Sequence, residues 1–231
     1  MINMIKIISF ELLILGGNVL DTQCIENENG YMEENIKSKH QVYPKIKRCI
    51  DIILSIIISI LVSPLVILIA IAIKLESKGP IIFKQTRCGK DSKTFEIYKF
   101  RTMKVGTPNV PTAQISKQGC QITKVGKFLR KSSLDEIPQL YNIIKGDMTL
   151  IGPRPVIVSE GKLIKLRQEY GIDALYPGIT GWAQVNGRDE IGVKEKVSYD
   201  YEYLKNISLG LDLKIAFITG LKVLKREGIR D

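Results

Sequence analysis

An uncharged run of 22 residues, IILSIIISILVSPLVILIAIAI at positions 52–73, limits what this chain can fold into more than any other feature. A run of about 18 or more apolar residues is typical of a helix that enters a membrane. Pro64 lies near the centre of the run, and a proline inside a helix removes one backbone hydrogen bond. The run therefore predicts either a kinked helix that crosses the membrane or a helix that enters and returns to the same face.

Length and flanking charge bear on this choice. One straight helix would measure about 33 Å, enough to cross a hydrocarbon core of about 30 Å, whereas a break at Ser63–Pro64 gives two arms, each about one leaflet deep. Pro64 also leaves the carbonyl of Ile60 without its helical partner, and the Ser63 hydroxyl is the nearest group able to satisfy it. Both flanks are basic, as two cytosolic ends would require, with Lys45, Lys47 and Arg48 before the run and Lys74 and Lys78 after it. These features favour re-entry, and a kinked spanning helix is the alternative.

Charge and cysteine content narrow the classes of partner. The formal charge of +10 and the pI near 9.4 indicate an anionic partner. Beside a membrane segment, anionic lipid and phosphorylated substrates are favoured over nucleic acid. The four cysteines include no CxxC pair and the chain has one histidine, so neither a zinc site nor a disulfide framework is indicated.

Three parts of the chain are expected. Residues 1–43 form a flexible or poorly defined extension, in which no signal-peptide cleavage site is evident and Met32 is an alternative start. Residues 44–78 form the membrane helix, and residues 79–231 form a compact domain.

This compact domain is expected to be mostly α with a small β-hairpin, an α+β fold. Residues 81–100 alternate on both sides of a Gly-Lys-Asp turn signal and predict the hairpin. A loop is expected over 104–120 and irregular chain over 177–187. Helical spacing predicts helices from Leu134 to about Gly146, over 158–170, over 193–204 and over 211–226. The last of these is amphipathic, which fits either core packing or a place in the membrane interface.

Two adjacent carboxylates, Asp135 and Glu136, lie in SSLDEIPQLYN (132–142) and admit two interpretations. In a capping box, Ser133 would accept from the N–H of residue 136 while Glu136 reaches back. Alternatively, the carboxylates could ligate Mg²⁺ or attack phosphorus.

Phosphoryl transfer also needs cations that neutralise developing charge. Arg130 lies just upstream of the acidic pair, and Arg154 lies between two prolines in GPRP (152–155), which restrict its backbone. Lys99 and Arg101 in YKFRTM (98–103) are further candidates for binding the substrate. None of these motifs is decisive by itself.

Taken together in order, the motifs identify a family. They are KRCID (47–51), the Ser63–Pro64 break, QTRCGK (85–90), IYKFRTM (97–103), LRKSSLDEIPQLYNIIKGDMTLIGPRP (129–155), PGITGWAQVNGRDE (177–190) and LDLK (211–214). From about Tyr43 to Ile229, the chain resembles the bacterial sugar transferases, small monotopic phosphoglycosyl transferases that begin glycan assembly on a polyprenyl carrier.

This resemblance implies an enzyme that moves a sugar-1-phosphate from a UDP-sugar to undecaprenyl phosphate and releases UMP. It implies a re-entrant membrane helix broken at Ser63–Pro64, interfacial amphipathic helices, and a cytosolic domain on the inner membrane. The expected partners are both substrates and inner-membrane phospholipid, with downstream glycosyltransferases as further candidates and no nucleic acid. The expected pathway is the first membrane step of capsule, exopolysaccharide, O-antigen or glycoprotein glycan synthesis.

Residue roles also follow from the resemblance. Asp135 matches the family's nucleophile, which forms a covalent phosphosugar intermediate, and Glu136 matches a metal or acid–base residue beside it. The implied cofactor is Mg²⁺, with Mn²⁺ as an alternative, held by both carboxylates. Arg130 and Arg154 match phosphate-binding and nucleotide-proximal arginines. A motif that orders the start of the membrane helix corresponds to Lys47, Arg48 and Asp51.

Two features depart from the shortest family members, namely the extension before Tyr43 and the longer loop over 104–122. That loop resembles a subgroup that makes capsule or exopolysaccharide, which favours N-acetylated or 6-deoxy sugars without fixing the donor. Two rival functions have distinct signatures. A membrane-anchored lipid-binding protein would release no UMP, and a nucleic-acid-binding module would bind DNA in a salt-dependent way.

Overall fold

The computed structural model describes residues 20–106, 122–187 and 191–225, with side chains from residue 43 onward. The chain divides into two compact units, Met1–Lys45 and Ile46–Asp231. In the part that is described, helices predominate over two small sheets, which confirms the predicted α+β character.

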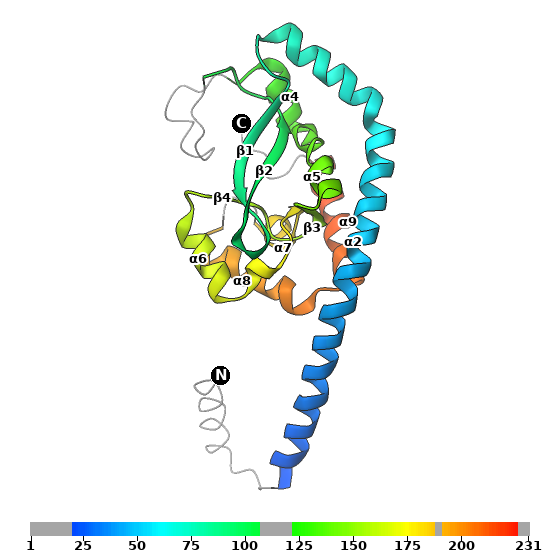
Figure 1. Cartoon of the computed structure of the whole chain (residues 1–231), viewed down its shortest axis with the longest axis vertical. Helices are drawn as coiled ribbons and strands as arrows, with labels where there is room; N and C mark the ends of the chain where they lie inside the picture. The colour runs from blue at the N-terminus through cyan, green and yellow to red at the C-terminus, as the bar shows by residue number, and fades with distance from the viewer. Residues whose placement is uncertain (1–19, 107–121, 188–190, 226–231) are drawn as a thin grey trace. The chain divides into compact units, whose positions relative to one another are not determined.

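The elements follow one another as Figure 1 shows. The α-helices are α2 (Leu20–Glu76), α4 (Lys124–Lys131), α5 (Gln139–Lys145), α6 (Gly161–Glu169), α7 (Trp182–Asn186), α8 (Val193–Asn206) and α9 (Leu209–Lys225). Short 3₁₀ helices are η1 (Lys90–Ser92), η2 (Leu134–Glu136) and η3 (Ile172–Ala174). The strands are β1 (Ile82–Cys88), β2 (Thr94–Phe100), β3 (Thr149–Ile151), β4 (Val156–Ile157) and β5 (Gly178–Thr180).

The predicted hairpin is confirmed by β1 and β2, which pair antiparallel from Ile82↔Phe100 to Cys88↔Thr94. Strand β4 adds to the other edge of β1, which gives the order β2-β1-β4. A second sheet joins β3 and β5 in parallel. Residues 177–187 are therefore not irregular as predicted, because β5 and α7 occupy them. Each of these elements completes little more than one hydrophobic period, which is too short for the sequence pattern to reveal it.

Helices α6, α8 and α9 confirm three of the predicted helices. The sequence did not predict α4, whose eight residues include Gly126. That glycine is required by packing, because a Cβ there would lie 2.1 Å from the carbonyl oxygen of Thr102. Most of the loop predicted over 104–120 lies outside the described residues.

Helix α2 runs without interruption through Ser63–Pro64, and it curves within its cyan part in Figure 1. The Ser63 hydroxyl donates to the Ile60 carbonyl oxygen at 2.8 Å, which confirms the predicted partner for the group that Pro64 leaves unbonded. The proline is thus accommodated inside the helix, and the predicted break is not seen as an end of the helix. The helix also extends back to Leu20, so the described part of the N-terminal extension is helical, and its flexibility stays a prediction.

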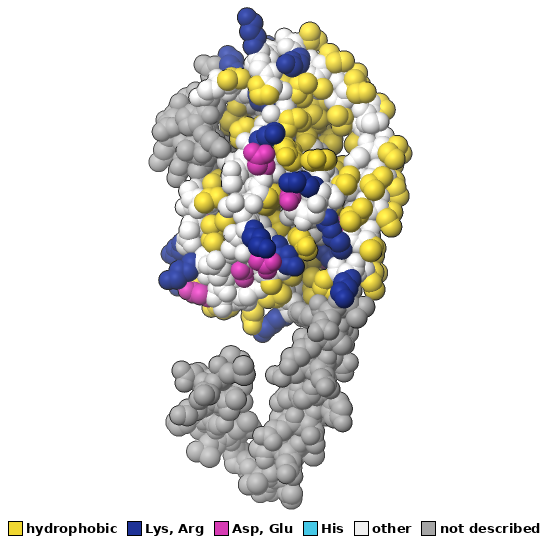
Figure 2. Space-filling model, viewed as in Figure 1, with side chains coloured by type: hydrophobic (Ala, Val, Ile, Leu, Met, Phe, Trp, Pro, Cys, Tyr) yellow, Lys and Arg dark blue, Asp and Glu magenta, His cyan; other side chains and the backbone are white. Residues whose placement is uncertain are grey.

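The segment Tyr43–Glu76 is long and apolar enough to cross a membrane. One side of it contacts the domain through Ser55, Ile69 and Ile73, which are buried. The opposite side exposes large apolar side chains, among them Ile60, Leu61 and Leu68 (Figure 2). An exposed apolar surface of this extent indicates a membrane-facing side.

The start of the apolar segment is fixed to the domain by buried charges. The Lys47 ammonium donates to Asp212 at 2.6 Å and lies 3.9 Å from Asp51. Asp51 accepts from the Thr149 hydroxyl, and the Tyr203 hydroxyl donates to the second Asp212 oxygen at 2.7 Å. Each buried charge thus has a partner of opposite sign or a hydrogen bond, as burial requires.

The end of the segment is fixed as well. The Glu76 carboxylate accepts from the backbone N–H groups of Lys124 and Val125, in the first turn of α4. An acidic group there satisfies open donors and suits the helix dipole. The Arg101 guanidinium donates to the carbonyls of Ser77 and Lys78 at 2.7 and 3.0 Å. Both ends of the apolar segment are therefore bonded to the same domain.

Removing the ammonium of Lys47 alone should destabilise the protein, because it leaves the Asp212 carboxylate buried without its counter-charge. Losing one partner of a buried pair typically costs about 3–5 kcal/mol. We expect Lys47→Met to lower the melting temperature in detergent strongly, and Lys47→Met/Asp212→Asn to recover part of the loss. Lys45→Met, which changes an exposed lysine, is the control. Equal melting of the Lys47→Met and Lys45→Met proteins would contradict this role.

Candidate active site

The acidic pair lies in η2, between α4 and α5, and of its two interpretations the capping box is wrong. Ser133 has a left-handed backbone (φ 56°), and its side chain makes no capping hydrogen bond. The N–H of Glu136 instead bonds to the carbonyl oxygen of Ser133 at 3.3 Å. The predicted single helix from Leu134 is consequently a 3₁₀ turn followed by α5, which begins after Pro138 and ends at Gly146 as expected.

Helix α5 is fixed against the hairpin by one buried side chain. The Asn142 amide accepts from the N–H of Tyr98 at 3.0 Å and donates to the carbonyl of Glu96 at 2.7 Å. It therefore binds the edge of β2 as a neighbouring strand would. Close by, the Arg48 guanidinium donates to the carbonyls of Ile143, in the last turn of α5, and of Met148, which follows the helix. These bonds hold the element that directly follows the acidic pair.

Glu136 is held by two cations. The Lys99 ammonium, from β2, donates to its Oε1 at 2.7 Å, and both side chains are mostly buried. The Arg154 guanidinium, from the segment before β4, lies 3.6 Å from the same oxygen, and 37% of its side chain is exposed. Lys99, Glu136 and Arg154, all predicted site residues, are thus brought together.

The Asp135 carboxylate differs from that of Glu136 in its bonding. Among the described residues, no hydrogen bond or ion pair reaches its carboxylate. Burial raises the pKa of Asp135 above its ordinary value, and nearby Glu136 raises it further, whereas Lys99, Arg130 and Arg154 lower it. The group therefore lies in a weakly solvated, cation-lined place with its oxygens not committed to other residues, which suits a nucleophile.

Arg130 and Arg101 have different surroundings. Arg130, in α4, donates through Nε to the Thr102 hydroxyl at 2.9 Å and acts electrostatically on Asp135. Arg101 is buried and bonded to the chain that leaves α2, and no hydrogen bond or ion pair joins it to the acidic pair within the described residues. A substrate-binding role for Arg101 stays a prediction, and its contacts are those of a structural residue.

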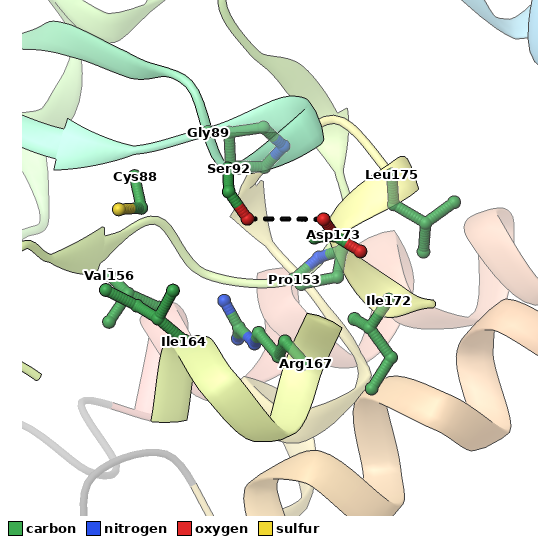
Figure 3. Close-up of a pocket in the computed structure, with 11 residues that line it drawn as sticks. Cys88, Gly89, Ser92, Pro153, Val156, Ile164, Arg167, Ile172, Asp173 and Leu175 are labelled. Carbon is green, nitrogen blue, oxygen red and sulfur yellow. Dashed lines mark hydrogen bonds between the residues drawn. The ribbon is translucent and has the colours of Figure 1, made fainter. Parts of the chain in front are cut away.

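An open hollow lies behind the segment that carries Arg154, and Figure 3 shows its lining. Across it, the Ser92 hydroxyl donates to Asp173 at 3.2 Å. Arg167 lines the same hollow and donates to the Arg154 carbonyl at 2.8 Å, while buried Asp200 accepts from it at 2.6 Å. The backbone at Arg154 is therefore held from behind by a buried ion pair.

Adjacent carboxylates can hold a divalent cation here, although no larger cluster of potential ligands occurs in the described part of the chain. Mg²⁺ commonly uses one or two carboxylates, with water and substrate phosphates as its other ligands. The desolvated Asp135 carboxylate, with its raised pKa, gains most from such a cation. The donor set of Asp135 and Glu136 therefore fits Mg²⁺.

Several residues that build the site were not singled out from the sequence. They are Asn142, Thr149, Arg167, Asp200, Tyr203 and Asp212. Asp212 lies inside the LDLK motif, and Asn142 inside the long motif that contains the acidic pair. The motifs therefore pointed to Asp212 and Asn142. The residues that bond to them, such as Lys47 and Tyr98, are far away in the sequence, and only the fold identifies them.

Known proteins match this chain over the described domain. A family model for bacterial sugar transferases matches residues 42–226. The UDP-glucose:undecaprenyl-phosphate glucose-1-phosphate transferase of Escherichia coli (strain K12) is 44% identical over 184 residues, which cover 77% of this chain and 40% of that protein.

Two further relatives differ in name and length. The UDP-N-acetylgalactosamine-undecaprenyl-phosphate N-acetylgalactosaminephosphotransferase of Aeromonas hydrophila is 41% identical over 82% of this chain and 46% of its own length. An uncharacterized sugar transferase of Bacillus subtilis (strain 168) is 38% identical, over 80% of this chain and 90% of its own length. This chain thus spans less than half of the two named transferases and nearly all of the third relative. With the family model matching most of its residues, the chain belongs to the bacterial sugar transferase family.

Proposed function

We propose that this protein transfers a sugar-1-phosphate from a UDP-sugar to undecaprenyl phosphate and releases UMP. The observation that carries the proposal is the contrast within the acidic pair. Glu136 is bonded to Lys99 and faces Arg154, whereas the Asp135 carboxylate is not bonded to any described residue but is surrounded by cations. The names of the relatives support the reaction class.

In the first half-reaction, an Asp135 carboxylate oxygen attacks the β-phosphorus of the UDP-sugar. An acyl-phosphate bond forms, the bond from that phosphorus to the bridging oxygen breaks, and UMP leaves with the electron pair. Arg130 and Arg154 balance the negative charge that accumulates on the phosphoryl oxygens. Glu136 keeps Lys99 in place, so the ammonium stays beside the reacting carboxylate.

In the second half-reaction, an oxygen of undecaprenyl phosphate attacks the same phosphorus, and the Asp135 carboxylate leaves. The fold supports delivery of this lipid from the membrane side. Leu134 and Ile137, on either side of the acidic pair, pack against a cluster that includes Ile69 and Ile73 of α2. The proposed nucleophile thus lies between two residues that pack against a cluster shared by the membrane helix and the domain.

Covalent catalysis predicts that Asp135→Asn loses nearly all turnover while keeping its fold, because an amide is a poor nucleophile towards phosphorus. Wild-type protein incubated with the UDP-sugar alone should gain a phosphosugar in intact-mass spectra. The donors to screen are UDP-glucose, UDP-galactose, their N-acetylated forms and 6-deoxy sugars, with UMP release as the readout. The matched control is Asp91→Asn, which changes an exposed carboxylate. Persistent turnover in Asp135→Asn, or UMP release only after undecaprenyl phosphate is added, would contradict the mechanism.

We also propose that Mg²⁺, with Mn²⁺ as an alternative, binds at Asp135 and Glu136. The cation would lower the electrostatic barrier between the carboxylate and the diphosphate. Arg154 remains a separate positive group, and its planar guanidinium suits a phosphate contact that lysine cannot reproduce.

Binding of Mg²⁺ should raise the melting temperature of the wild-type protein, since a ligand that binds only the folded state stabilises it. The pKa of Asp135 is raised, so protons compete with the cation as the pH falls towards that pKa, and the stabilisation should shrink. We expect the shift and UMP release to disappear in EDTA and to return with excess Mg²⁺, while Asp135→Asn shows no shift. Full activity in excess EDTA would refute the requirement.

A re-entrant membrane helix on the cytoplasmic face of the inner membrane is the topology we propose. The apolar segment is bonded to one domain at both ends, through Lys47 and Arg48 at its start and through Glu76 at its end. A domain that binds its UDP-sugar in the cytosol would keep both ends on that side. The exposed apolar face between them would lie in the inner leaflet.

Re-entry predicts that single cysteines placed before Pro44 and after Asp231 are both labelled only from the cytosolic side. The test uses a background without native cysteines and a thiol reagent that does not cross the membrane. Right-side-out cells and inverted vesicles provide the two orientations, and a periplasmic cysteine in an unrelated membrane protein is the positive control. Labelling of the N-terminal site in intact cells would show a spanning helix instead.

A further inference from the structure

Strand β1 carries two polar side chains, Gln85 and Arg87, on the same face of the sheet as Phe83. Residues paired directly across an antiparallel ladder point to the same side, and so do alternate residues along each strand. Because Phe83 pairs with Lys99 and Arg87 pairs with Phe95, Arg87 and Lys99 share a face. This is the face from which Lys99 reaches Glu136. The exposed Lys84 belongs to the opposite face, where its ammonium lies 3.7 Å from the Glu96 carboxylate.

Arg87 is directed at the segment that carries Arg154. Its Nη1 donates to the carbonyl oxygen of Pro155 at 3.3 Å, and its Nη2 donates to Gln85. Strand β4, which begins at Val156, pairs with β1 at this point, with Arg87 opposite Ile157. Backbone pairing therefore fixes the Arg87 guanidinium beside the residue that follows Arg154.

The hydrogen bonds to Pro155 and Gln85 leave part of the Arg87 guanidinium unsatisfied. Its Nε is buried and has no hydrogen-bond partner among the described residues. Burial and, to a smaller extent, the nearby positive Arg154 lower the pKa of Arg87 to about 10, against the opposing effect of Glu160 and Glu136. Arg87 and Arg154 act electrostatically on each other, so an anion placed between the two partly desolvated guanidinium groups would be attracted by both.

We propose that Arg87 and Arg154 together bind the diphosphate of the nucleotide sugar, with Arg87 as a second phosphate-binding arginine. This inference rests on the proposed function, which supplies the diphosphate. A guanidinium offers more N–H groups than the hydrogen bonds of Arg87 to Pro155 and Gln85 use, so it can keep its bond to Pro155 and still donate to a phosphate oxygen. Arg87 would thus link the sheet, the Arg154 segment and the substrate.

The test compares UDP, which carries the diphosphate but no sugar to transfer, with uridine, which carries no phosphate. Binding of both to the full chain in detergent is measured by calorimetry, with competition against UDP for weak binding. We expect Arg87→Met to weaken UDP binding about tenfold or more, as the loss of a charge-assisted contact does, and to leave uridine binding unchanged. The KM for the UDP-sugar should rise by a similar factor, with a smaller change in kcat.

The matched control is Lys84→Met, which removes a cation from the opposite face of the same strand and should change neither ligand's binding. Unchanged UDP binding in Arg87→Met, or equal loss of UDP and uridine binding, would overturn the inference. Should Arg87→Met fail to fold, Arg87→Lys decides, since it keeps the charge but not the planar fork. A UDP affinity three- to tenfold weaker is about what we expect there, and an unchanged affinity would overturn the inference.

Failure of this inference can be told apart from failure of the proposed function. UDP binding is measured without turnover, so it tests Arg87 even when no UDP-sugar yields UMP. Conversely, wild-type UMP release together with unchanged UDP binding in Arg87→Met and Arg87→Lys leaves the reaction in place and removes only the role of Arg87.

Discussion

A buried salt bridge between Lys47 and Asp212 joins two parts of the chain that are 165 residues apart. Desolvating two charges is costly, and the cost is recovered only where geometry is good and the remaining oxygens are bonded. Here the Tyr203 hydroxyl satisfies the second Asp212 oxygen, and Thr149 satisfies Asp51 one helical turn after Lys47. Because these bonds are directional, they fix how the membrane helix lies against the domain.

The position of that helix in turn determines the position of the acidic pair. Ile69 and Ile73 form one cluster with Phe100 and Leu129, and both neighbours of the acidic pair pack on it. From the other direction, Arg48 bonds to the end of α5 and Asn142 ties α5 to the edge of β2. Asp135 is thus positioned by neighbouring elements that contact the membrane helix and the hairpin. Such support keeps a reactive carboxylate in place without binding it directly.

How far the sequence predicted this arrangement depends on the distance between partners. The hairpin, the helices α6, α8 and α9, and the bond from Ser63 to Ile60 are local, and local patterns predicted them. The capping box failed at Ser133, whose side chain makes no capping bond, and the Glu136 carboxylate binds Lys99 of another element. Nothing in the sequence distinguished the role of Lys99 from that of Arg101. Strand β2 ends at Phe100, however, and Lys99 bonds to Glu136 whereas Arg101 bonds to the chain that follows α2. The partner of Lys47 could not be predicted, since no local period relates it to Asp212.

The cluster shared by α2 and the domain also bears on how the protein is made. Phe100 and Leu129 belong to the domain, but the cluster that buries them includes Ile69 and Ile73 of the membrane helix. A domain separated from that helix would leave this apolar surface open to water, at a cost that grows with the area exposed. Completion of the core is therefore coupled to placement of the helix during biosynthesis. The helix is a structural part of the domain, and an unrelated membrane anchor could not substitute for it.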